Sequence, residues 1–279
     1  MDAEKIQALR RMAANIRLGV LEGVYNAKSG HPGGSLSSAD LFAYLYFHEL
    51  HVDPQNPKCP SRDRFVLSKG HCAPGLYAAL AHKGYFSPDE LKKLRHIGAM
   101  LQGHPDMKGT PGVDMSTGSL GQGISAAVGM ALAGKMDGQD YRVYCLLGDG
   151  EIQEGQVWEA CMFAAHRNLD NLCLVLDYNG LQIDGDVAQV AGIEPLGGKF
   201  QSFGFEVAQA DGHDFESLEQ AFAAARNCKG KPFAIIAKTV KGKGVSFMEN
   251  QAGWHGKAPN EEQYHKAMDE LNAALAQLA

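Results

Sequence analysis

Asp149 and Asn179 are the residues whose type and position point most directly to chemistry. Asp149 stands between two glycines after the apolar run 141–147, and Asn179 follows a second apolar run, 172–177. Mg²⁺ prefers oxygen ligands such as carboxylates, together with phosphate oxygens and water. The glycines let backbone amides approach phosphate oxygens, and a helix is expected to begin just after them. The pattern predicts a Mg²⁺–diphosphate site; for the Gly-Asp-Gly tripeptide alone, a tight turn is the alternative.

Two other phosphate-binding loops are excluded by spacing. The sequence contains no GxxxxGK[ST], the pattern of P-loop nucleotide hydrolases. The segment 121–123 starts like a GxGxxG dinucleotide-binding loop, but it lacks the rest of that pattern.

Neighbouring parallel strands are needed to bring Asp149 and Asn179 together. The runs 141–147 and 172–177 are almost continuously apolar, which is typical of strands buried on both faces of a parallel sheet. A helix predicted over 156–167 joins them into a βαβ unit. A right-handed crossover places both strands in one sheet, and ligands bind at its carboxyl edge.

The rest of the chain continues this alternation of strands and helices. We predict an α/β fold with a parallel sheet flanked by helices, in one domain over residues 1–279. Ser87-Pro88 marks a further helix start. The other predicted strands cover 64–68, 205–208 and 232–237, and the other helices cover 3–26, 40–50, 74–83, 123–136, 215–227 and a last stretch around 264–278.

Composition narrows the functional classes. The net charge of −6 is unlike that of nucleic-acid-binding proteins, and no apolar run approaches the ~18 residues of a membrane span. The basic run 238–243 is interpreted as a solvated loop rather than a phosphate contact. The first residues lack the apolar stretch of a signal peptide, and the six cysteines form no CxxC pair, so we expect buried thiols and a cytoplasmic protein. Glycine is in excess, 33 of 279 residues.

The sequence resembles the thiamine diphosphate-dependent transketolases over nearly its whole length. The motifs that carry this resemblance occur in the family's order at Ser29–Gly33, Leu67–His71, Gly103–Pro105, Pro111–Gly123, Gly148–Ala160, Leu176–Gly185 and Gly253–Gly256. The resemblance implies the diphosphate-binding (PP-type) fold. It also implies thiamine diphosphate held through Mg²⁺, which Ca²⁺ or Mn²⁺ is able to replace.

The resemblance also implies roles for individual residues. Asp149 and Asn179 would bind the metal through their side chains and Leu181 through its carbonyl, while Glu154 and Glu159 would lie at a subunit contact that couples two cofactor sites. Glu151 stands where many members carry cysteine. The implied cofactor-binding residues are His71, Gly118, Leu120, Gly148, Asp149, Gly150 and Asn179, and the implied catalytic residues are His31, His71, His104 and His255. The other histidines are interpreted as core or surface residues: His48, His51, His82, His96, His166, His213 and His265.

In this family a second, pyrimidine-binding domain activates the thiamine ring, and it would follow residue 279. We therefore expect a split transketolase whose pyrimidine-binding and C-terminal domains lie on a partner chain, in an α₂β₂ assembly that acts on sugar phosphates. Alternatives are a specialised ketol transferase or an enzyme like 1-deoxyxylulose-phosphate synthase. A non-catalytic module with the same fold is a third alternative.

Overall fold

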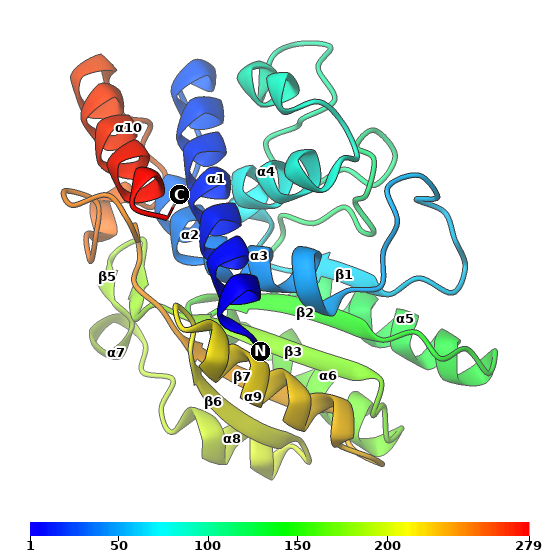
Figure 1. Ribbon diagram of the computed structural model, residues 1–279. Coiled ribbons are helices and arrows are strands. Elements are labelled where there is room, and N and C mark those ends of the chain that lie inside the picture. Colours follow the sequence, from blue (N-terminus) through cyan, green and yellow to red (C-terminus); the bar gives the residue numbers. More distant parts are fainter. Residues whose placement is uncertain (279) are drawn as a thin grey trace.

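The centre of the computed structural model, which describes residues 1–278, is a parallel five-stranded sheet (Figure 1). The strand order is β1-β2-β3-β7-β6, and every neighbouring pair runs parallel. The predicted parallel α/β fold is therefore confirmed, and each predicted strand is present to within two or three residues at either end. The strands are β1 (Arg64–Leu67), β2 (Val143–Gly148), β3 (Leu172–Tyr178), β6 (Glu206–Asp211) and β7 (Phe233–Lys238).

Successive residues of the central strands enter two different hydrophobic cores. Leu146 of β2 and Val175 of β3 belong to one core, whereas Leu147 and Leu176 belong to the other. Side chains alternate between the faces of a strand, so a strand covered on both sides needs an apolar residue at every position. This is why β2 and β3 are continuous apolar runs.

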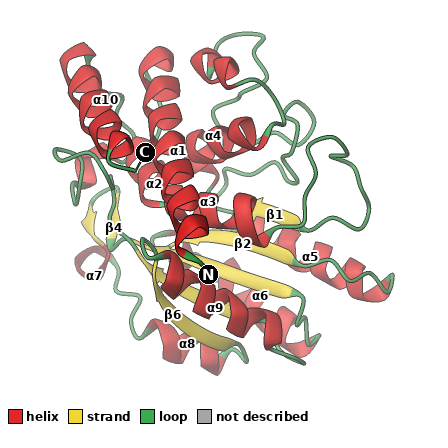
Figure 2. Cartoon of the chain, viewed as in Figure 1, coloured by secondary structure: helices red, strands yellow, loops and turns green. Residues whose placement is uncertain are grey.

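Helices cover both faces of the sheet (Figure 2). A short hairpin of β4 (Leu181–Gln182) and β5 (Gly185–Asp186) follows β3 and leads into α7 (Val187–Val190). The helices that contribute to the first core are α1 (Ala3–Ala27), α2 (Pro32–Ser37), α3 (Ala39–Tyr44), α4 (Ala73–Lys83), α9 (Phe215–Asn227) and α10 (Glu261–Ala276). Those that contribute to the second are α5 (Gly123–Met136), α6 (Gly155–His166), α7 and α8 (Leu196–Ser202).

Some elements differ from the sequence-based prediction. The helix expected over 40–50 is α-helical only to Tyr44 and continues as a π-helical turn, Leu45–Glu49. Glu49 at the end of that turn is buried, accepts a hydrogen bond from Tyr144 of β2 at 2.7 Å and pairs with Arg226 of α9. The helix predicted at Ser87-Pro88 is a 3₁₀-helix, Pro88–Lys93, and α2, α7, α8 and the β4–β5 hairpin were not predicted.

All six cysteines are free; four are buried, but Cys59 and Cys228 are partly exposed, so the expectation that all are buried is wrong for these two.

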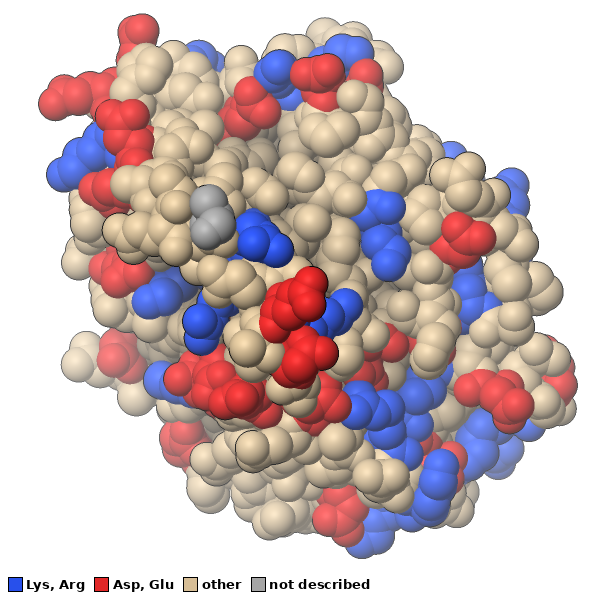
Figure 3. All heavy atoms as spheres, in the orientation of Figure 1, with Lys and Arg blue, Asp and Glu red and all other residues tan. Residues whose placement is uncertain are grey.

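No helix within residues 1–278 has the length and apolar character needed to span a membrane. On the face drawn in Figure 3, acidic and basic side chains are interspersed.

Candidate active site

The carboxyl ends of four strands meet around one cavity of about 340 Å³. Lys69 follows β1, Asp149 follows β2, Asn179 follows β3 and Lys241 follows β7, and all four line this cavity. The structure thus brings Asp149 and Asn179 together at the sheet edge, as their positions predicted. Other residues implied by the resemblance that line the cavity are His71, Leu120, Gly148, Gly150, Glu154, Leu181 and His255.

Asp149 is almost completely buried, with 2 % of its surface exposed. Its carboxylate accepts hydrogen bonds from the amides of Gly150 at 2.8 Å and Gly180 at 2.6 Å. Burial, and then the negative charge of Asp177, raise the pKa of Asp149 to about 6. A raised carboxylate pKa means that the ionised form is poorly compensated within the protein, so a bound cation would stabilise it.

Asn179 and Leu181 add two neutral oxygens beside this carboxylate. The amide nitrogen of Asn179 donates to Asp177 at 3.2 Å, and its Oδ1 accepts from the amide of Leu181 at 3.1 Å. The carbonyl oxygen of Leu181 accepts from the ammonium of Lys241 at 3.2 Å. One carboxylate, one amide oxygen and one carbonyl form a donor set of oxygens only, which fits Mg²⁺.

Gly148 and Gly150 flank Asp149 and line the cavity. The amide of Gly148 donates to Glu151 at 3.0 Å and that of Gly150 donates to Asp149, so both amides are engaged within the protein rather than free for a phosphate. A Cβ at Gly148 would meet only the side chains of Lys69 and Glu151, at ordinary contact distances of 3.5 Å or more. Since no protein contact there requires glycine, the space that it leaves belongs to the cavity, and this fits close approach of a ligand to the backbone.

Four histidines from four separate loops cluster beside the cavity. The ring of His31 lies 5.3 Å from that of His71, 6.3 Å from that of His104 and 5.4 Å from that of His255, measured between centroids. Nδ1 of His31 is buried and has no hydrogen-bond partner among the described residues. Buried polar atoms are nearly always paired in folded proteins, so an unpaired imidazole nitrogen here fits a site that binds a polar ligand.

Gly118 lies against the histidine cluster and does not line the cavity. Its φ is +150°. A Cβ at Gly118 would lie 2.9 Å from the ring of His104. The close approach of the backbone to His104 therefore explains this glycine.

The histidines are held in their neutral form. Burial is the main cause that lowers the pKa of His31 to about 4 and that of His255 to about 3. Burial also lowers the pKa of His71 and His104, and neighbouring positive charges act in the same direction on all four. Near neutral pH each ring is therefore unprotonated and has one nitrogen that can accept a hydrogen bond or a proton from a ligand.

The lowered pKa values predict that the chain loses stability as the pH falls from about 6.5 to about 4. Within this window the unfolded chain binds protons at His31 and His255, whereas the folded chain does not, so acid favours unfolding. We expect the drop in Tm between pH 7.5 and pH 5 to be smaller in His255→Asn than in the wild type. Differential scanning fluorimetry measures both.

The matched control is His265→Asn, since His265 is exposed on α10. Because the pKa of Asp149 is raised on folding, acid stabilises the folded chain through this residue between about pH 4 and 6. This contribution is the same in the wild type and in both variants, so it does not change the comparison. An acid-induced drop in Tm of the same size in His255→Asn and in the wild type would contradict the prediction.

Lys69 and Asp177 form a buried ion pair that the sequence reasoning missed. Both side chains are at most 2 % exposed, and Asp177 belongs to β3 itself. Lys69 also donates to Ser38 at 2.6 Å, while Asp177 accepts from Ser37 at 2.7 Å and from Thr239. Because Asp177 also binds Asn179, this cluster connects the ends of β1, β3 and β7 to the candidate metal ligand.

Lys241 corrects the interpretation of the basic run 238–243 as a solvated loop. Lys238 is exposed, but Lys241 is 2 % exposed and its ammonium lies 3.1 Å from Nδ1 of His255. Burial lowers the pKa of Lys241. A buried cation in the same cavity as Asp149 is suited to binding a phosphate oxygen.

Glu151 is a further residue of the cavity to which the sequence analysis assigned no role. Its carboxylate is buried and accepts from Ser68 at 2.5 Å, from the amide of Gly121 at 3.0 Å and from the amide of Gly148. One side chain therefore connects three loops around the cavity. Its position directly after Gly-Asp-Gly was the only signal in the sequence.

The two glutamates implied at a subunit contact lie on and before α6. Glu154 is the N-cap residue of this helix, and Glu159 is exposed one turn further on. Met162 and Phe163 on the same helix are 55 % and 45 % exposed. Glu154 also lines the cavity, so this end of α6 connects the cavity to an outer surface.

Comparison with known proteins identifies relatives of this chain. The chain is 48% identical to the 6-deoxy-6-sulfo-D-fructose transketolase subunit SqwG of Clostridium sp. (strain MSTE9), over 94% of this chain and 96% of that protein. It is 40% identical to an apulose-4-phosphate transketolase subunit of Phocaeicola vulgatus, over 98% of this chain and 97% of that protein.

Larger transketolases match over part of their length. The chain is 45% identical to human transketolase over 92% of this chain, but over only 41% of the human protein. The crystal structure of Campylobacter jejuni transketolase superposes with a TM-score of 0.90 at 35% identity, over all of this chain and 46% of that one. Residues 8–274 match the family described as "Transketolase, thiamine diphosphate binding domain". The chain therefore belongs to the transketolase family, as its thiamine diphosphate-binding part.

Proposed function

We propose that this chain is the N-terminal subunit of a transketolase that transfers a two-carbon ketol unit from a ketose phosphate to an aldose phosphate. The observation that carries this proposal is the cluster of four neutral histidines beside the cavity that holds Asp149 and Asn179. Ketol transfer requires removal of a proton from a donor hydroxyl and delivery of a proton to an acceptor carbonyl. A neutral imidazole would accept the proton in the first step, and the imidazolium so formed would donate it in the second.

In this proposal the cofactor is thiamine diphosphate bound through Mg²⁺. Asp149, Asn179 and the carbonyl of Leu181 would hold the metal, and Lys241 would bind a diphosphate oxygen. His71, Leu120, Gly148 and Gly150, which line the same cavity, would contact the cofactor, with Gly118 close behind His104. When bound, the thiazolium ring supplies the electron sink of the reaction. The residues of this chain bind and orient it, and His31, His71, His104 and His255 bind substrate hydroxyls and move protons.

The complete active site would need a partner chain. We propose that residues 1–279 form a single PP-type domain and that the pyrimidine-binding and C-terminal domains lie on a separate polypeptide, in a cytoplasmic α₂β₂ assembly. Two relatives of nearly the same length bear the name of transketolase subunits, which supports this arrangement. The exposed Met162 and Phe163 offer apolar surface for a subunit contact. Glu154 and Glu159 would couple two cofactor sites across that contact.

A reconstitution assay tests the proposal. We expect the purified chain with Mg²⁺ and thiamine diphosphate to show no ketol transfer from xylulose 5-phosphate to ribose 5-phosphate. Adding a chain with a pyrimidine-binding domain is expected to produce the activity, because the residue that activates the thiamine ring would lie there. Full activity of the chain alone would contradict the split arrangement, whereas no activity with any partner would contradict the proposed reaction.

A second candidate is a specialised ketol transferase. The relatives with 48% and 40% identity are named for 6-deoxy-6-sulfo-D-fructose and apulose 4-phosphate. Product analysis of the reconstituted pair with these ketoses and with xylulose 5-phosphate separates the two candidates. Pyruvate as donor tests for a 1-deoxyxylulose-phosphate-synthase-like reaction, and loss of all activity on substitution of Asp149 would contradict a non-catalytic module.

A further inference from the structure

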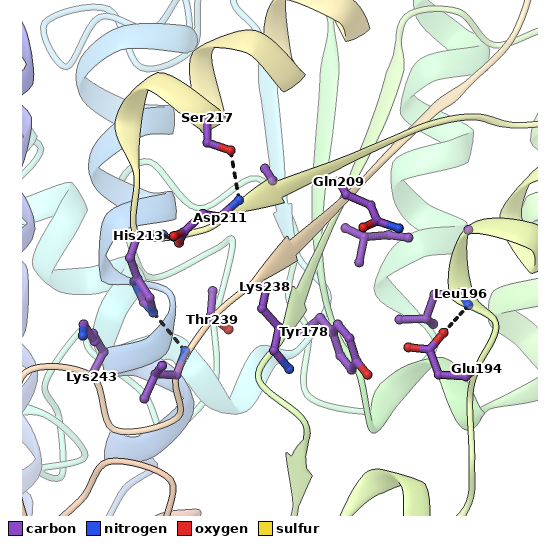
Figure 4. A pocket seen from close by; sticks show the side chains of 14 residues that line it. Tyr178, Glu194, Leu196, Gln209, Asp211, His213, Ser217, Lys238, Thr239 and Lys243 are labelled. Carbon is purple, nitrogen blue, oxygen red and sulfur yellow. Dashed lines mark hydrogen bonds between the residues drawn. The ribbon is translucent and has the colours of Figure 1, made fainter.

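His213 accepts one hydrogen bond and donates another. The sequence analysis assigned it no functional role. It lies in the connection between β6 and α9, and its side chain is 16% exposed. Its Nε2 accepts from the backbone amide of Val240 at 2.9 Å, a contact drawn in Figure 4. Its Nδ1 lies 2.6 Å from the carboxylate of Asp40. Because a backbone amide can only donate, the ring proton is on Nδ1 and is donated to Asp40.

Asp40 extends this contact into a buried network. Asp40 lies on α3 and forms an ion pair with Arg17 of α1, both side chains being at most 10 % exposed. Nε of Arg17 donates to the backbone carbonyl of Lys243 at 3.0 Å. The Arg17–Asp40–His213 network therefore begins at the amide of Val240 and ends at the carbonyl of Lys243, so both of its ends hold the same short segment.

Lys241 lies between these two anchored positions. The segment 240–243 turns sharply at Gly242, where φ is +77° and a Cβ would clash with the backbone of Met248. From this turn the Lys241 side chain reaches the cavity and contacts the Leu181 carbonyl and His255. A long, flexible ammonium side chain gains a defined position only if its backbone is held, because lysine has four rotatable side-chain bonds.

His213 itself lies outside the candidate active site. It lines a different cavity, of about 740 Å³, together with Tyr178, Asp211 and Lys238 (Figure 4). It is absent from the residues that line the cavity of Asp149. The direct connection from His213 to the cofactor cavity is its hydrogen bond to the backbone of Val240, one residue before Lys241.

We propose that His213 is a positioning residue: by accepting the amide hydrogen of Val240, it holds Lys241 in the cofactor cavity and so raises the affinity for the diphosphate. This inference rests on the proposed function, which makes Lys241 a ligand of the diphosphate. A purely structural role for His213, through Asp40 alone, is the alternative.

Two substitutions separate the two hydrogen bonds. His213→Gln places an acceptor near the position of Nε2 and keeps a partner for Val240, but it loses the donor to Asp40. His213→Asn places a donor near the position of Nδ1 and keeps the bond to Asp40, but it leaves the amide of Val240 without an acceptor. The control is His265→Asn, at an exposed position on α10.

Two measurements on the full chain test the proposal. We expect acylation of Lys241 by an amine-reactive reagent, followed by mass spectrometry, to be about tenfold faster in His213→Asn than in the wild type, and near the wild-type rate in His213→Gln and His265→Asn. We expect the Kd for thiamine diphosphate with Mg²⁺ to rise about tenfold in His213→Asn alone, as the loss of one hydrogen bond implies.

The outcomes separate the positioning role from the proposed function. Wild-type Lys241 reactivity in His213→Asn would overturn the positioning role, as would a wild-type Kd, and so would equal effects of the Asn and Gln variants. A wild-type chain that binds no thiamine diphosphate, alone or with its partner, would contradict the proposed function. The Lys241 reactivity would then still show whether His213 positions this side chain.

Discussion

Replacing Asp149 with asparagine is expected to weaken the binding of Mg²⁺ and thiamine diphosphate by at least about a hundredfold. Asn keeps the shape of the side chain but removes the only charged oxygen of the candidate metal site, leaving Asn179 and the Leu181 carbonyl. Losing a residue that merely supports a metal ligand costs about 10- to 100-fold, so losing a ligand costs at least the upper value. Isothermal titration calorimetry and the ketol transfer rate of the reconstituted pair measure the effect.

The same substitution is expected to stabilise the chain without cofactor. The pKa of Asp149 rises from 3.8 to about 6 on folding, so above pH 6 the folded chain carries an ionised carboxylate that burial disfavours, at a cost of about 3 kcal/mol. Asp149→Asn removes this cost. We therefore expect a higher Tm than that of the wild type at pH 7.5, and a difference that disappears below about pH 4, where Asp149 is protonated in both states.

The control for both effects is Asp184→Asn, because Asp184 lines the same cavity but is exposed. This variant is expected to keep both the cofactor affinity and the Tm of the wild type. Wild-type cofactor affinity in Asp149→Asn would show that Asp149 is not a metal ligand. A lower Tm in that variant would show that its two backbone hydrogen bonds outweigh the cost of the buried charge.

Replacing Lys69 with methionine is expected to lower the free energy of unfolding by about 3–5 kcal/mol. The substitution leaves Asp177, which is completely buried, as a charge without a counter-ion. Removing one partner of a buried pair costs this much because the other remains desolvated. The pKa of Asp177 is held below its usual value mainly by Lys69, against the effect of burial, so the substitution also raises that pKa. Urea unfolding measures the loss.

A double substitution tests whether the ion pair itself is the cause. Adding Asp177→Asn to Lys69→Met removes the unpaired charge, so we expect an interaction free energy of at least about 1 kcal/mol between the two positions. The control is Lys92→Met, which breaks the exposed pair with Asp89 and is expected to cost no more than about 1 kcal/mol. Strictly additive effects of the two buried substitutions would contradict the explanation.

Much of the fold was predictable because it depends on local sequence patterns. The bounds predicted for 123–136 and 215–227 coincide with those of α5 and α9, and the apolar runs after Arg142 and Asn171 are β2 and β3. The elements that were missed are short or irregular. The β4–β5 hairpin has two-residue strands, and α2 has only six residues with two adjacent glycines. Elements of this length make too few local interactions to leave a periodic pattern.

The sequence by itself determined which part of the sheet Asp149 and Asn179 share, and the structure places both at one cavity there. Asp149 and Asn179 follow apolar strands joined by one helix, and the handedness of such crossovers then places them at one edge. The motifs that contain His31, His71, His104 and His255 are also readable from local sequence.

Only the tertiary structure decided how charge is distributed around that edge. The basic run contains three lysines, Lys238, Lys241 and Lys243, of which only Lys241 is buried. The turn at Gly242 follows it directly, and the amide of Gly242 donates to the carbonyl of Gly33, more than two hundred residues away in the chain. The ionisation and hydrogen bonding of a side chain depend on what lies within a few ångströms of it in space. Sequence spacing does not contain that information for residues far apart in the chain.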